Sequence, residues 1–132
     1  MDRPIEFIPD DDPVYHRIHK TYIQADGISP NAFANSPKKG PAMSVDWAKY
    51  ASPAETRARA PKPTENAVVQ FVAGEVRQVP GQKVEHSPDA SQNNRAHADV
   101  VGQKTTEVRT HLSRIWKPAI PLEQASPGPH PP

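Results

Sequence analysis

The chain has 132 residues, with 16 Lys and Arg against 15 Asp and Glu, so its formal net charge is +1. This balance lacks the strong positive charge typical of nucleic-acid-binding domains, and we expect no nucleic-acid partner. The absence of cysteine excludes disulfides, thiolate nucleophiles and cysteine-ligated zinc. Only 35% of the residues are hydrophobic and 17 are proline, which indicates a small core with long irregular connections.

Composition divides the chain into three parts. An acidic, proline-containing segment at 1–13 precedes a single domain at 14–116, and a proline-rich tail follows at 117–132, which we expect to be disordered. No apolar run approaches the roughly 20 residues of a membrane span. The first residues lack the basic and apolar regions of a signal peptide. We therefore expect a soluble cytoplasmic protein without a membrane partner.

The first half of the domain predicts two strands and a helix. Residues 14–19 mix apolar and polar side chains on both faces of a predicted strand, and a second short strand is predicted at 43–46. The motif Ser-Pro-Ala-Glu at 52–55 predicts a capping box with proline in the first helical turn. The helix is expected over 53–60, because prolines follow it.

The second half predicts four strands and the longest helix. Residues 67–73 are almost continuously Val, Phe and Ala, which is typical of a central strand buried on both faces. Further strands are predicted at 75–79, 83–86 and 96–101, bounded by glycine and proline. A helix at 106–116 places four apolar side chains on one stripe: Val108, Leu112, Ile115 and Trp116.

These elements predict an α+β domain with a small, mainly antiparallel sheet. The helices at 53–60 and 106–116 are expected to pack on one face of that sheet.

Polar residues flank one loop in the second half of the domain. His86, Asn93 and Arg95 are predicted binding residues, and His97 is a candidate catalytic residue at the same loop. Arginine pairs with oxyanions and histidine exchanges protons near neutral pH, so this group suits a phosphate or a ribose. The alternative is a solvent-exposed loop with two unrelated histidines.

No pattern predicts a metal or a resident cofactor. The spacing of His86 and His97 fits no zinc motif, and His16 and His19 point to opposite faces of their strand. The glycines form no phosphate-binding loop. Ser44 shares a strand face with Asp46, but the sequence around it does not match the hydrolase motif G-x-S-x-G, so a triad with His16 or His86 is not expected.

Three segments carry a family likeness: DDDPVYHRIH at 10–19, SVDWAKYASPAETRAR at 44–59 and NRAHADVVG at 94–102. They resemble a family of small bacterial proteins of uncharacterised activity, over about residues 8–116. The resemblance implies a single domain in a bacterial cytoplasm. Together with the lack of a coherent catalytic motif, the proline-rich tail favours an accessory or interaction domain that binds a protein partner.

A second resemblance implies an alternative function. The order of YHRIH, DGIS and MSVD along the chain is similar to that in ADP-ribosyl transferases and RNA 2′-phosphotransferases. This resemblance implies a transferase that uses NAD or a 2′-phosphorylated RNA end in a cleft between residues 14–19 and 43–46. The implied site has Arg17 at a phosphate, His16 at a ribose hydroxyl, Ser44 at the neighbouring ribose or amide, and His97 as a second polar wall.

Overall fold

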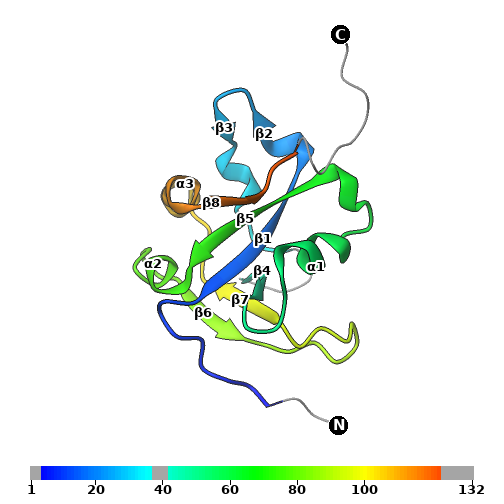
Figure 1. Ribbon diagram of the computed structural model, residues 1–132. Helices are drawn as coiled ribbons and strands as arrows, with labels where there is room; N and C mark the ends of the chain where they lie inside the picture. Colours follow the sequence, from blue (N-terminus) through cyan, green and yellow to red (C-terminus); the bar gives the residue numbers. More distant parts are fainter. Residues whose placement is uncertain (1–3, 37–41, 123–132) are drawn as a thin grey trace.

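A six-stranded antiparallel sheet in the order β6-β7-β4-β1-β5-β8 forms the centre of the protein (Figure 1). The computed structural model describes residues 4–36 and 42–122. The six strands are β1 (Pro13–His19), β4 (Ala42–Trp47), β5 (Asn66–Val72), β6 (Lys83–His86), β7 (His97–Val101) and β8 (Lys117–Ile120). A separate two-stranded sheet joins β2 (Ile23–Gln24) to β3 (Gly27–Ile28).

Within the described residues, three α-helices and three short 3-10 helices accompany the sheets. The α-helices are α1 (Pro53–Ala58), α2 (Ala73–Arg77) and α3 (Thr106–Ile115). The 3-10 helices are η1 (Lys20–Tyr22), η2 (Pro30–Ala32) and η3 (Pro63–Glu65). None of the helices in the described part of the chain is long and apolar enough to cross a membrane. The α+β class and the mainly antiparallel sheet expected from the sequence are confirmed.

The strand predicted at 75–79 is wrong, because this stretch begins within helix α2. Ala73, Val76 and Val79 recur every three residues, and all three are fully buried in the core. The N-terminal segment fixes the turn: the amide of Gly74 donates to the carbonyl of Asp10 at 2.8 Å. A side chain at Gly74 would lie 2.9 Å from Asp10 Cβ, so glycine permits this close approach.

Both ends of the domain extend beyond the boundaries expected from composition. Ile8 lies in the segment set apart at 1–13, yet it is 1% exposed and belongs to the core. The predicted tail begins at residue 117, but 117–120 form β8, whose residues pair with Val68, Val69 and Gln70 of β5. Leu122 of the same tail packs against the core, and residues 123–132 lie outside the described part of the chain.

The two faces of the six-stranded sheet differ in character. One face carries the apolar core, with Val14, Val45 and Phe71 from three adjacent strands. On the other face, Tyr15 pairs with Asp46, so Arg17 and Ser44, each two residues further along antiparallel strands, lie on the same side. The polar residues of the central strands are thus gathered on one face.

The helices α1 and α3 lie on opposite faces, which corrects the expectation that they share one. Val108 and Leu112 place α3 in the apolar core. By contrast, the one buried side chain of α1 is the polar Thr56, whose hydroxyl donates to Asp46 on the polar face at 2.9 Å. The short helix α1 lacks an apolar stripe, and its contacts are therefore made to polar groups.

The capping box of α1 leads to a first testable prediction. Ser52 Oγ accepts from the amide of Glu55 at 3.1 Å, and the Glu55 carboxylate accepts from the amide of Ser52 at 2.9 Å. We expect Ser52→Ala to lower the free energy of unfolding by about 1 kcal/mol, because the first-turn amide loses its acceptor. Urea denaturation measures this change. Ser52→Thr keeps an acceptor and should lose much less; an equal loss in both variants would contradict the assignment.

Candidate functional site: a polar cleft on the sheet

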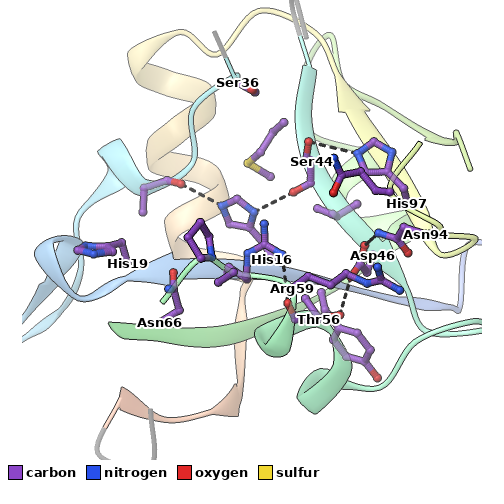
Figure 2. Close-up of a pocket in the computed structure, with 18 of the residues that line it drawn as sticks. His16, His19, Ser36, Ser44, Asp46, Thr56, Arg59, Asn66, Asn94 and His97 are labelled. Carbon is purple, nitrogen blue, oxygen red and sulfur yellow. Dashed lines mark hydrogen bonds and ion pairs between the residues drawn. The ribbon is translucent and has the colours of Figure 1, made fainter. Parts of the chain in front are cut away.

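A cleft of about 680 Å³ opens on the polar face of the sheet (Figure 2). Strands β1 and β4 contribute its floor, while α1 with the chain that follows it and the loop before β7 contribute walls. This volume lies within the range of small-molecule sites. The polar residues that matter below all line it: Arg17, Ser44, Asp46, Thr56, Arg59, Asn94 and His97.

The buried carboxylate of Asp46 holds the walls of the cleft together. It is 4% exposed, and its two oxygens accept from different elements. Oδ2 accepts from Thr56 Oγ1 of α1, and Oδ1 accepts from Asn94 Nδ2 of the loop before β7, each at 2.9 Å. Arg59 Nε lies 4.0 Å from Oδ2. Because both oxygens already have partners, Asp46 acts here as a structural anchor.

The half-buried guanidinium of Arg17 has no carboxylate partner within 4.0 Å among the described residues. Its Nη1 donates to the backbone carbonyl of Thr56 at 3.1 Å. Burial lowers the pKa of Arg17, Asp46 acts in the opposite direction, and the neighbouring Arg59 lowers it further. A guanidinium stays protonated in spite of such shifts, so Arg17 brings a positive charge into the cleft.

Ser44 and His97 form a hydrogen-bonded pair at the edge of the cleft. Ser44 Oγ lies 3.3 Å from His97 Nε2 (Figure 2). On the other side of the ring, Nδ1 lies 2.9 Å from the backbone carbonyl of Ser87 and 2.9 Å from Ser87 Oγ. A carbonyl oxygen only accepts, so the ring proton is on Nδ1 and Nε2 presents a lone pair to the Ser44 hydroxyl. This is the arrangement of a nucleophile and its general base.

Asp99 extends the pair into a chain of four residues. Its Oδ2 accepts from Ser87 Oγ at 2.8 Å, so the hydroxyl that contacts the His97 ring is itself oriented. Its Oδ1 is buried, has no hydrogen-bond partner among the described residues, and lies 3.9 Å from His97 Nε2. When Nε2 takes up a proton, this carboxylate is close enough to stabilise the imidazolium.

His16 bridges two parts of the backbone beneath the cleft. Its Nδ1 lies 3.1 Å from the carbonyl oxygen of Ser44, and its Nε2 lies 3.0 Å from that of Ala32 (Figure 2). An imidazolium donates to both carbonyls, whereas a neutral imidazole donates to only one. Burial nevertheless lowers the pKa of His16, because the lost hydration outweighs the two carbonyl contacts. Both ring nitrogens are therefore engaged in holding the fold.

The predicted catalytic candidates come together, whereas the predicted binding group does not. Arg17, Ser44 and His97 line the same cleft, as does His16. His86 lies on the opposite face, with its ring centre 5.1 Å from that of Trp47, because β6 alternates and directs Val84 and His86 inward.

The two remaining members of the predicted binding group also lie apart from the cleft. The Arg95 guanidinium lies over the ring of Tyr50, 4.1 Å from its centre. Asn93 is exposed, with a left-handed φ of 50°, and it is the neighbouring Asn94 that points into the cleft. His86, Asn93, Arg95 and His97 are thus not one site.

Sequence reasoning missed most of the polar residues that surround the Ser44–His97 pair and the Asp46 carboxylate in the cleft. These are Thr56, Arg59, Ser87, Asn94 and Asp99, whereas Asp46 was noted only as a residue on the same strand face as Ser44. One signal was available: Ser44 and Asp46 are two residues apart on one strand, as are His97 and Asp99 on another. Two such polar pairs on strands that become neighbours produce one polar patch.

Comparisons with protein-family models, with curated proteins and with solved structures find no match to this chain. The chemistry of the cleft is therefore argued from its own residues. Within residues 4–36 and 42–122, no three His, Asp or Glu side chains are grouped so that they would hold a metal ion.

The two carbonyl contacts of His16 lead to a second prediction. Because its folded-state pKa is below the ordinary value of about 6.5, the unfolded chain takes up the proton first as the pH falls. Folding stability should therefore fall as the pH drops below about 6.5. His16→Gln keeps a donor but does not titrate, so the melting temperature should fall less between pH 7 and pH 5 than in the wild type.

The same series includes its controls. Three carboxylates have lowered pKa values: Glu6, Glu55 and Glu65. The stability that they contribute is lost only below about pH 4.5, outside the range from pH 7 to pH 5. His111→Gln changes an exposed histidine and should leave the wild-type pH dependence intact. An unchanged slope in His16→Gln would show that His16 is not the titrating group.

Proposed function

We propose that the cleft is an active site for acyl or phosphoryl transfer, with Ser44 as the nucleophile and His97 as its general base. The observation that carries this proposal is the chain of hydrogen bonds from Ser44 through His97 and Ser87 to Asp99. It provides a hydroxyl, a base with a free lone pair, and a group that orients the base. The cleft beside it is large enough for a small-molecule substrate.

The proposed reaction proceeds in two steps. Ser44 Oγ attacks an acyl carbon or a phosphorus atom while its proton moves to His97 Nε2. His97 then gives that proton to the leaving group as the bond to it breaks. In the second step, water loses a proton to His97 and attacks the covalent intermediate, and the proton returns to Ser44 Oγ. The half-buried Arg17 faces the same cleft and offers positive charge to the oxygens that become more negative.

A fluorophosphonate probe tests the nucleophile without knowledge of the substrate. We expect mass spectrometry to find the probe on Ser44, and Ser44→Ala to abolish labelling. His97→Gln should slow labelling by about a hundredfold or more, because the base is lost. The other serines of the same chain are the internal control. Labelling spread over several serines, or labelling of Ser44 that persists at the same rate in His97→Gln, would overturn the proposal.

A second candidate function is favoured by one observation: Arg17 and Ser44, far apart in sequence, line the same cleft. The resemblance to ADP-ribosyl transferases and RNA 2′-phosphotransferases requires this convergence. In such a transferase, Arg17 binds a phosphate of NAD and Ser44 contacts the ribose. The resemblance implied that His16 contacts a ribose hydroxyl, but both of its ring nitrogens face backbone carbonyls. In this candidate function, Ser44 and His97 make the ribose contact instead.

Calorimetry with NAD tests this second candidate. We expect binding in the millimolar range or tighter, weakened at least tenfold in Arg17→Ala, because a charge-assisted contact to phosphate is lost. Arg114→Ala removes an exposed arginine from the end of α3 and should bind as the wild type does. The absence of heat at millimolar NAD would remove NAD as the ligand.

The interaction role expected from the sequence stays a prediction. Its proposed docking segment falls mainly on residues 123–132, outside the described part of the chain. The exposed side chains of Ile5 and Phe7, each 75% exposed, are consistent with contact to a protein partner. The bacterial cytoplasmic setting likewise rests on the sequence alone.

A further inference from the structure

We infer that Arg17 and Arg59 form a binding site for a phosphoryl group of the substrate. The inference rests on the proposed function, because it names the class of molecule on which Ser44 would act. It goes further in assigning the recognition of that molecule to residues outside the reactive pair.

Within the described residues, Arg17 has no carboxylate partner of its own, and its one printed hydrogen bond goes to a backbone carbonyl. Arg17 and Arg59 bring two positive charges near one carboxylate. That carboxylate already accepts from Thr56 and Asn94, and its nearest guanidinium nitrogen is 4.0 Å away. Arg59 also lies near the carboxylate of Glu55, whose pKa it lowers, and Glu65, which lines the cleft, is engaged by His19 at 3.1 Å and by Lys20 at 3.9 Å. A partly buried positive charge without a counter-ion is costly, and an anionic ligand removes that cost.

The guanidinium of Arg17 is held in place before any ligand arrives. The contact from Nη1 to the Thr56 carbonyl fixes the plane of the group. Arg17 lines the cleft, and this contact uses one of the five N–H donors of its guanidinium. A fixed fork of donors loses little conformational entropy on binding an oxyanion.

Two guanidinium groups from different elements suit a phosphoryl group better than a carboxylate. Arg17 comes from the middle of β1, whereas Arg59 is the C-terminal capping residue of α1. One arginine fork satisfies both oxygens of a carboxylate. A phosphoryl group presents three strong acceptor oxygens, which two separate guanidiniums can share. Figure 2 shows Arg59 beside Asp46, on the wall that faces Ser44 and His97.

Calorimetric titration with inorganic phosphate tests the inference. We expect saturable binding by the wild-type protein and at least tenfold weaker binding in Arg17→Lys and in Arg59→Lys, because lysine keeps the charge but loses the fork. Arg59 is partly exposed, so its variant keeps the result interpretable if Arg17→Lys unfolds. Circular dichroism verifies the fold of each. Arg114→Lys makes the same change on exposed α3 and should bind phosphate as the wild type does.

Acetate is titrated in parallel to test the choice of ligand. Phosphate binding at least tenfold tighter than acetate binding supports a phosphoryl site, and equal binding overturns it. Unchanged phosphate binding in Arg59→Lys also overturns it. The proposed function has a separate readout: labelling of Ser44 without phosphate binding refutes this inference alone, whereas phosphate binding without labelling refutes the nucleophile alone.

Discussion

The architecture of the cleft depends on the buried carboxylate of Asp46. An ionised group in this position requires hydrogen bonds to replace lost water, and Thr56 and Asn94 supply them from two separate segments. The helix α1 has no apolar stripe to attach it to the sheet, so this contact and the one between Arg17 and the Thr56 carbonyl define where it lies. An unsatisfied buried partner costs about 1–3 kcal/mol, which makes the arrangement of helix, strand and loop mutually dependent.

The sheet carries the apolar core on one face and the polar cleft on the other. Helix α3 and the N-terminal Ile8 both contribute to the apolar side, together with Phe33. That core leaves the opposite side of β1 and β4 free to carry Arg17, Ser44 and Asp46. A polar surface on the central strands of a small protein would otherwise weaken the fold. Here the cost is limited, because the hydrophobic contacts do not require those positions.

Local patterns predicted elements whose cause is local. The capping box at Ser52 and the apolar stripe of α3 depend on neighbours within a few residues, and both were readable. The structure of the stretch after β5 was not readable from its local pattern. Val76 alternates with Arg77 as in a strand, and it also follows Ala73 by three residues as in a helix. The hydrogen bond from Gly74 to Asp10 decides in favour of the helix. The partner of Ser44 was sought at His16 or His86. The correct neighbour, His97, follows from the pairing of Ser44 with Asp99, and strand register across 55 residues is absent from any local pattern.

The two edge strands of the sheet, β8 and β6, determine whether a second copy of the chain can add a strand to the sheet. In β8, Pro118 has no N–H to offer a further strand. In β6, the exposed Lys83 and Glu85 alternate with buried residues and place charges along the opposite margin. Edge strands with proline or with exposed charges are poor templates for hydrogen bonding to a strand of another molecule. The sheet is thus terminated on both sides, and crowded solutions of the protein should resist fibrous aggregation through strand addition.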